Sequence, residues 1–188
     1  MLDLLVVAPH PDDGELGCGG TLARAKAEGL STGILDLTRG EMGSKGTPEE
    51  REKEVAEASR ILGLDFRGNL GFPDGGLADV PEQRLKLAQA LRRLRPRVVF
   101  APLEADRHPD HTAASRLAVA AVHLAGLRKI QLTVSNMAVG SRLILTILQV
   151  RSWKNRCNLQ TFFWEEKHLR FSPVIGLNML TFGLALMM

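Results

Sequence analysis

The chain has 188 residues, of which 45% are hydrophobic and 24% are charged, and its formal net charge is +3. A chain of this length and composition is typical of a single globular domain with its own hydrophobic core. The small net charge gives no reason to expect a nucleic-acid partner. Two cysteines are too few for the disulfide framework of a secreted domain.

Neither end of the chain predicts passage into or across a membrane. The N-terminus lacks the basic region and the cleavage site of a signal peptide. The apolar C-terminal stretch 174–188 has 15 residues, fewer than the roughly 20 that span a bilayer. We therefore expect a soluble, cytoplasmic protein with no membrane partner.

The first predicted elements are a strand over residues 3–8, a helix over 16–28 and a second strand over 32–38. The first strand is a short apolar run that ends before Pro9. Gly29 follows the helix at the position where glycine commonly ends one. The residues available to the inner side of this helix are Leu16, Leu22, Ala23 and Ala25.

A glycine-rich loop, RGEMGSKGTP (residues 39–48), follows the second strand and is longer than a simple connection needs to be. Such loops often carry functional residues. The next helix begins after Thr47, which can cap it and can form a capping box with Glu50. This helix is predicted to run to Leu62 and to end at Gly63.

The second half of the pattern begins with a weaker strand and turn within residues 65–76. A helix over 81–94 follows, and Pro96 stops it. The run RVVFAPL predicts a strand over 97–103, and an alanine-rich segment predicts a helix over 112–126.

This alternation predicts an α/β fold of three layers, in which helices cover both faces of a mostly parallel sheet. Residues 1–129 would form the catalytic core. Residues 130–188 would form a C-terminal segment of the same domain with a different composition, and within it residues 143–150 would form a strand or a helix. In such sheets, ligands bind beyond the carboxyl ends of the strands where strand order reverses. We expect this position, and hence the active site, at the carboxyl ends of the first and fourth strands.

Two clusters of histidine and aspartate follow those two strands. One loop carries His10, Asp12 and Asp13, and the other carries His108, Asp110 and His111. Because both loops leave the sheet at the same edge, we expect the clusters to meet. Two histidines and one carboxylate with an open fourth position are typical of a catalytic zinc site. The simplest assignment gives the metal His10, Asp13 and His111, since a turn at Pro11 brings residues 10 and 13 together.

The other three cluster residues can carry acid–base chemistry. Zinc lowers the pKa of a bound water to about 7, and Asp12, next to a ligand, is placed to accept its proton as general base. His108 can stabilise an oxyanion and protonate a leaving group. Asp110 would fix the tautomer of His108. These roles predict hydrolysis of an amide or ester, with zinc or, almost equally well, iron(II) as the metal.

Three separated motifs, PHPDDGELGCGG, TRGEMGSKGTPEERE and DRHPDH, resemble in order and spacing those of the LmbE-like (PIG-L) zinc-dependent N-deacetylases. The resemblance covers about residues 3–127 and is strongest to the bacterial deacetylases of the bacillithiol pathway, which act on N-acetylglucosaminyl malate. It implies a Rossmann-like fold and a homo-oligomer, a trimer or hexamer. It also implies the roles already given to His10, Asp13 and His111 as ligands, Asp12 as base and His108 as acid or electrostatic catalyst.

The same resemblance implies residues that bind the substrate. Glu41, Arg51 and Asp74 would contact the sugar, and Arg51 with Arg107 would hold a carboxylate of the aglycone. The expected reaction removes an acetyl group from a small molecule that contains N-acetylglucosamine. Members of the family carry a further lobe that closes over the substrate, and residues 130–188 do not align with it, so this segment is either divergent or altered.

Other interpretations stay open. GELGCGG follows a strand and opens a helix, so it could cradle a phosphate in a non-catalytic nucleotide- or sugar-binding domain, although it lacks the spacing of the known glycine motifs. A zinc esterase acting on another acyl compound would use the same machinery. Arg51 lies in the charged sequence EEREKE, which by itself favours a surface ion pair. A mere binder, however, has no need of Asp12 and His108 beyond the three ligands.

Overall fold

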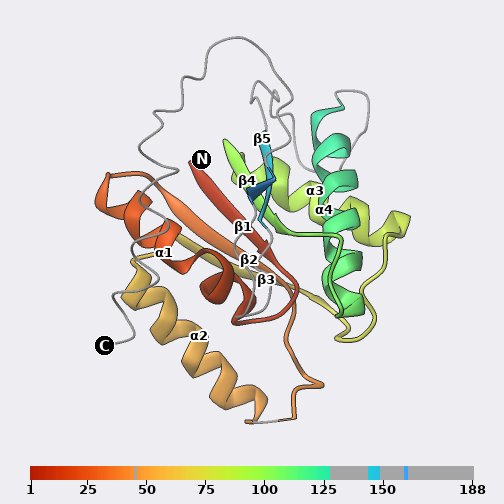
Figure 1. Ribbon diagram of the computed structural model, residues 1–188, viewed down its shortest axis with the longest axis horizontal. Helices are drawn as coiled ribbons and strands as arrows, with labels where there is room; N and C mark the ends of the chain where they lie inside the picture. Colours follow the sequence, from red (N-terminus) through yellow and green to blue (C-terminus); the bar gives the residue numbers. More distant parts are fainter. Residues whose placement is uncertain (45, 128–143, 149–158, 161–188) are drawn as a thin grey trace.

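The structure is a computed structural model that describes residues 1–44, 46–127, 144–148 and 159–160. Its strands are β1 (Leu4–Ala8), β2 (Thr32–Thr38), β3 (Phe66–Phe72), β4 (Val98–Pro102), β5 (Ile144–Leu148) and β6 (Leu159–Gln160). Its helices are α1 (Asp13–Ala27), α2 (Pro48–Leu62), α3 (Pro81–Leu94) and α4 (Pro109–Gly126). Strands and helices alternate up to α4, as the sequence predicts (Figure 1).

The described strands form one sheet in the order β3-β2-β1-β4-β5-β6. The pairs from β3 across to β5 are all parallel, and β6 pairs with β5 in the antiparallel direction. The chain moves outward from β1 to β3 and then returns to place β4 on the other side of β1. Strand order therefore reverses between β1 and β4, which confirms the predicted mostly parallel α/β sheet.

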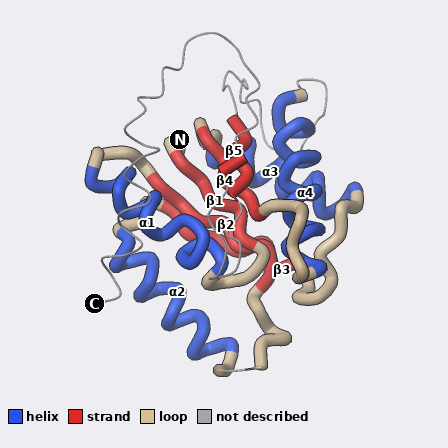
Figure 2. The backbone as a smooth tube through the Cα atoms, in the orientation of Figure 1, coloured by secondary structure: helices blue, strands red, loops and turns tan. Residues whose placement is uncertain are grey.

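Helices cover both faces of this sheet (Figures 1 and 2): α1 and α2 lie on one face, and α3 and α4 on the other. The side chains of β1 alternate between the two cores, as the period of a strand requires. Leu5 and Val7 pack in the core that includes α3 and α4, whereas Val6 and Ala8 pack in the core that includes α1. Because both faces of β1 are buried, its sequence is apolar throughout.

Several predicted boundaries agree with the structure. Residues 32–38 form β2, residues 81–94 form α3, and α2 ends at Leu62 before Gly63. The capping box is present: the Thr47 side chain accepts from the Glu50 amide, and the Glu50 carboxylate accepts from the Thr47 amide. Within the ambiguous segment 143–150, residues 144–148 form a strand. Most of the predicted segment 130–188 lies outside the described residues.

The starts of α1 and α4 are corrections to the sequence analysis. The predicted helices begin at residues 16 and 112, but α1 begins at Asp13 and α4 at Pro109. Acidic side chains in a first helical turn are stabilised by the helix dipole, and proline suits the first helical position. The apolar periodicity begins only after these turns, so it marks each helix too late. Asp13, Asp110 and His111 consequently lie in helices and not in loops.

The inner side of α1 also differs from the prediction. Leu16 is 74% exposed and Ala23 is exposed. The residues that α1 buries are Gly14, Cys18, Leu22 and Ala25. The cause is the close approach of Gly14 to β2, since a Cβ at this position would lie 3.0 Å from Cγ2 of Ile34.

No helix in the described ranges combines the length and the apolar character that a membrane crossing demands.

The contact at Gly14 predicts opposite effects for two glycine-to-alanine changes in α1. Gly20→Ala should stabilise the protein by about 0.5–1 kcal/mol, because alanine favours the helix and a Cβ at this position meets no atom within 4 Å. Gly14→Ala should destabilise it by about 1–3 kcal/mol through overpacking against Ile34. Urea unfolding of both variants measures the difference. Equal stability of the two variants would show that α1 does not depend on this close approach.

Candidate active site

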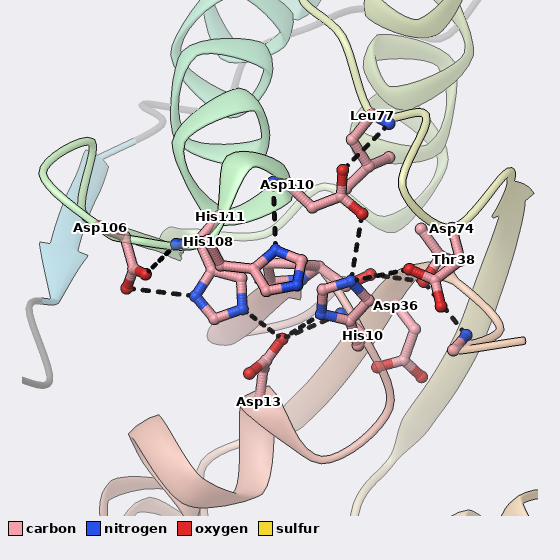
Figure 3. Close-up of polar contacts among 12 residues, drawn as sticks. His10, Asp13, Asp36, Thr38, Asp74, Leu77, Asp106, His108, Asp110 and His111 are labelled. Carbon is pink, nitrogen blue, oxygen red and sulfur yellow. Dashed lines mark hydrogen bonds and ion pairs between the residues drawn. The ribbon is translucent and has the colours of Figure 1, made fainter. Parts of the chain in front are cut away.

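The structure brings the two predicted clusters together at the edge of the sheet where β1 and β4 end (Figure 3). Asp12 is the N-cap of α1, and His108 is the N-cap of α4. The ring centroids of His10 and His108 lie 4.9 Å apart, as do those of His108 and His111. Residues separated by about a hundred positions thus form one site, because β1 and β4 are parallel neighbours.

Asp13 lies between the two histidines that the sequence assigns to a metal. Its Oδ2 is 3.0 Å from Nδ1 of His10 and 3.2 Å from Nε2 of His111. One ligand atom from each of these three residues lies within 4.8 Å of the others. The side chains are partly open to solvent, with exposed fractions of 14% for His10 and 22% for Asp13 and His111. The three donors can therefore converge on one ion that a substrate can reach.

His10, His108 and Asp110 also meet the distance requirement for a metal site. The Asp110 carboxylate is fully buried, however, and accepts hydrogen bonds from the backbone amides of Gly75, at 2.8 Å, and Leu77, at 3.3 Å. These bonds engage both of its oxygens in holding the turn after β3. Asp13 is the more suitable ligand because its Oδ2 faces two histidines at once.

In His10 and in His111, the ring nitrogen that does not face Asp13 faces another carboxylate. Nε2 of His10 lies 3.1 Å from Asp74 and 3.2 Å from Asp110, and Nδ1 of His111 lies 3.2 Å from Asp106. Histidines that bind metals almost always donate their second ring N–H to such a partner, which fixes the tautomer and the ring orientation. This donor set fits a divalent ion such as zinc or iron(II). Sequence reasoning missed Asp106, although it lies only two residues before His108.

Carboxylates hold protons on these histidines when no ion is bound. Burial lowers the pKa of His10, but the carboxylates of Asp13, Asp110 and Asp74 outweigh burial and raise that pKa to about 9. Asp13 and Asp106 raise the pKa of His111, although burial opposes them. Burial raises the pKa of Asp13, but its bonds to the two histidines outweigh burial and hold that pKa well below its usual range. A metal ion would replace protons at this cluster.

His108 and Asp110 contact each other differently from the prediction. The sequence analysis assigns the tautomer of His108 to the Asp110 carboxylate, but it is the backbone amide of Asp110 that donates to Nδ1 of His108, at 3.2 Å. The reason is the early start of α4, which makes His108 the N-cap and turns the Asp110 carboxylate inward to His10. Since an amide can only donate, Nδ1 accepts, and a neutral His108 carries its proton on Nε2.

Asp12 has an unusual backbone conformation, with φ 117° and ψ −32°. Non-glycine residues at such positive φ cost about 1–3 kcal/mol and cluster at active sites. Its side chain is exposed beside the candidate ligands. Desolvation by the surrounding atoms and the charge of Asp13 raise the pKa of the Asp12 carboxyl above its usual value. The strained backbone and the raised carboxyl pKa of Asp12 are both features that cluster at functional sites.

A buried ion-pair network connects the start of α1 to strands β2 and β3. Arg67 on β3 donates from Nε and Nη2 to Asp36 on β2, at 2.7 and 3.0 Å, and from Nη1 to Glu15 in the first turn of α1. Arg67 is only 11% exposed. This network fixes α1 against β2 and β3 and so positions Asp12 and Asp13. The sequence analysis did not find it, because no local pattern links these three elements.

The predicted sugar contacts, Glu41 and Asp74, hold two loops together. Oδ2 of Asp74 accepts from the Met42 amide at 2.8 Å, and Oε1 of Glu41 accepts from the Asp74 amide at 2.9 Å. The exchange ties the glycine-rich loop after β2 to the turn after β3. Both carboxylates lie beside the site but already accept backbone hydrogen bonds.

Arg51 turns toward the glycine-rich loop. A Cβ at Gly40 would lie 3.0 Å from its Nη1, and a Cβ at Gly43 would overlap with its Nη2. Its charge also acts on Asp12, where it lowers the carboxyl pKa against the stronger effect of desolvation. Arg51 is half-buried near the site. Arg107, its predicted partner, is exposed in the connection between β4 and α4.

Comparison with known proteins agrees with this geometry. Residues 5–122 match the family described as PIG-L, GlcNAc-PI de-N-acetylase. The chain belongs to the PIG-L family. The matched region contains both histidine–aspartate clusters and extends from β1 nearly to the end of α4.

Three similar proteins give a measure of the likeness. Diacetylchitobiose deacetylase of Thermococcus kodakarensis is 34% identical in an alignment 134 positions long, gaps included, that covers 66% of this chain and 50% of the relative. The 1D-myo-inositol 2-acetamido-2-deoxy-alpha-D-glucopyranoside deacetylase of Saccharomonospora viridis is 33% identical in an alignment 175 positions long, gaps included, that covers 74% of this chain and 65% of the relative. The crystal structure of a conserved protein from Thermus thermophilus is 86% identical, with a TM-score of 0.75, over 81% of this chain and 68% of that one.

The strained backbone at Asp12 predicts that this PIG-L chain is more stable with glycine than with alanine at position 12. Asp12→Gly should be more stable than Asp12→Ala by about 1 kcal/mol, because both remove the carboxylate but only glycine adopts this φ without strain. Urea unfolding of the metal-free variants measures the difference. An Asp12→Ala variant as stable as Asp12→Gly would show that the conformation carries no strain.

Proposed function

We propose that this chain is a metal-dependent N-deacetylase that removes an acetyl group from a small molecule containing N-acetylglucosamine. The observation that carries the proposal is the position of Asp13 between His10 and His111, with Asp12 and His108 beside them and outside the ligand set. The names of the two curated relatives support the reaction, since both are deacetylases. The chain spans 50% and 65% of their lengths.

His10, Asp13 and His111 would hold the ion, which we propose to be zinc, with iron(II) as the alternative. A divalent ion held there supplies Lewis acidity toward an amide carbonyl and toward water. Asp74, Asp106 and Asp110 keep the histidine rings oriented for it.

The residues outside the ligand set supply proton transfer. Asp12 would accept a proton from the water that attacks the acetyl carbonyl, since its carboxylate lies next to the ligand Asp13. His108 would donate a hydrogen bond from Nε2 to the developing oxyanion, because its Nδ1 is engaged by the Asp110 amide and a neutral ring has no second proton to release. Asp12, protonated by the attacking water, would pass that proton to the nitrogen of the leaving amine. The amide C–N bond breaks, water is consumed, and acetate and a free amine are the products.

The proposed substrate is of the N-acetylglucosaminyl malate type. Arg51 supports an anionic aglycone because its guanidinium lies against the glycine-rich loop and acts on Asp12. Arg107 would complete the binding of that carboxylate, and Glu41 and Asp74 would contact the sugar. We also propose that residues 130–188 belong to the same domain and that the protein is a cytoplasmic homo-oligomer, a trimer or hexamer.

The phosphate-binding alternative has less support. The first turn of α1 follows Asp12 and contains Asp13 and Glu15, so carboxylates surround the helix N-terminus that a phosphate would need. Like charges at that position would repel a nucleotide. A zinc esterase remains the second candidate, because an ester carbonyl would meet the same residues.

Two substitutions separate metal binding from proton transfer. His111→Ala should lose the metal, whereas Asp12→Asn should keep it and lose about 10²- to 10⁴-fold in rate. Metal content by elemental analysis and acetate release from N-acetylglucosamine derivatives would be measured on the same zinc-reloaded samples. A wild-type protein without zinc would contradict the proposed metal site, and near-normal turnover by Asp12→Asn would exclude Asp12 as the base.

Arg51 predicts a preference for acidic substrates. Arg51→Met should raise KM for N-acetylglucosaminyl malate by about 10- to 100-fold, the value of one or two charge-assisted hydrogen bonds, and should leave KM for diacetylchitobiose unchanged. Gly43→Ala should act in the same direction, because its Cβ displaces the guanidinium without removing the charge. Equal loss on both substrates would show that Arg51 does not recognise the aglycone.

A further inference from the structure

We propose that Asp74 is a positioning residue that couples the glycine-rich loop to metal binding at His10. Its two carboxylate oxygens serve different parts of the chain: Oδ1 lies 3.1 Å from Nε2 of His10, and Oδ2 accepts from the Met42 amide. The inference rests on the metal site of the proposed function. It assigns to Asp74 a task that does not require contact with the substrate.

The loop side of this link is reciprocal. Asp74 accepts from the backbone of Met42, and its own backbone amide donates to the Glu41 carboxylate. The second oxygen of Glu41 accepts from the Arg39 amide, at 3.2 Å, so this carboxylate also stabilises the turn of its own loop. We call Asp74 and Glu41, with the two amides they exchange, the loop clamp. Each carboxylate in the loop clamp holds backbone of the opposite loop.

The contact between Asp74 and His10 is largely buried, and it fixes which nitrogen of the His10 ring carries the proton. The Asp74 side chain is 9% exposed, and that of His10 is 14% exposed. An ionised carboxylate can only accept, so Nε2 of His10 must carry the proton of a neutral ring. The lone pair is then on Nδ1, which faces Asp13 at 3.0 Å. Asp74 thereby favours the tautomer of His10 whose free nitrogen points to the other ligands.

Asp110 shares this task and anchors a different backbone segment. Its Oδ2 lies 3.2 Å from Nε2 of His10, and its carboxylate also accepts from the amides of Gly75 and Leu77. Asp110 thus holds the turn after β3, in which Asp74 lies. Of these two carboxylates, Asp74 extends the connection to Met42 and Glu41.

A coupling of this kind acts in both directions. If an ion on Nδ1 holds His10 in place, the bond from Nε2 to Asp74 is maintained, and the loop clamp keeps the glycine-rich loop closed on the turn after β3. By thermodynamic linkage, an ordered loop then raises metal affinity to the same degree. The glycine-rich loop carries Glu41, and its Gly43 contacts the Arg51 guanidinium. This loop would be ordered most fully in the metal-loaded protein.

Asp74→Asn tests the link with little change of shape. An asparagine side chain has one oxygen acceptor, so it can serve the Met42 amide or the Nε2 proton of His10, but not both. We expect the dissociation constant of zinc to rise by about 10- to 100-fold, as for other carboxylates that orient metal-binding histidines. Asp79→Asn is the matched control, because Asp79 lies in the same connection and pairs with Arg84 at its surface. Its zinc affinity should equal that of the wild type.

Hydrogen exchange at Met42 gives a readout that is independent of catalysis. Zinc should slow exchange of this amide in the wild type and in Asp79→Asn, and the slowing should be lost in Asp74→Asn. Glu41→Ala provides a second variant, since Glu41 is exposed and removing it opens the loop clamp from the opposite loop. It should weaken zinc binding in the same direction.

Unchanged zinc affinity and unchanged protection in Asp74→Asn, with only a higher KM, would overturn the proposal and leave Asp74 as a substrate contact. Zinc binding by the wild type without acetate release would contradict the proposed reaction alone, and the zinc affinities of the variants would still decide the role of Asp74. A wild-type protein that binds no zinc would overturn both.

Discussion

Parallel pairing of β1 with β4 is the constraint on which the site depends. Two parallel neighbours deliver their carboxyl ends to the same edge of the sheet, and each is followed here by a helix that begins within a few residues. The N-termini of α1 and α4 therefore converge, and with them His10, Asp13 and His111. Antiparallel neighbours would place the two clusters at opposite edges and would separate Asp13 from His111. The remaining features of the site follow from this convergence.

Convergence concentrates negative charge, and the structure compensates for it on two sides. On the side of the sheet, Arg67 on β3 forms ion pairs with Asp36 and Glu15. On the side of the site, His10 and His111 carry protons that Asp13 and its neighbouring carboxylates favour. A divalent ion bound as proposed would replace these protons at the point where the histidines and Asp13 meet. Desolvation in the crowded site, together with the charge of Asp13, also explains the raised pKa of Asp12.

The loops around the site are held by carboxylates that accept from backbone amides. Asp110 and Asp74 each contact His10 with one oxygen while holding loop backbone, and Glu41 completes the exchange between the two loops. Such bonds are directional and depend on the histidine ring lying in one orientation. The orientation of the His10 ring and the arrangement of these two loops are therefore parts of one network. Under the proposed function, substrate recognition by residues of the glycine-rich loop would then depend on the state of the metal site.

The sequence by itself determined the features that depend on neighbouring residues. Strand 32–38 and helix 81–94 follow from local apolar patterns bounded by glycine and proline, and the capping box at Thr47 needs only four adjacent residues. The ligand types and their nearness could be inferred because the order of strands and helices predicts a parallel sheet. Only the tertiary structure decided which carboxylate serves which histidine. Asp110 faces His10 and not His108 because α4 starts three residues earlier than its apolar pattern indicates. The pairing of Arg67 with Glu15 and Asp36, and the placement of Arg51 against Gly43, depend on segments that are distant along the chain, whose contacts no local pattern encodes.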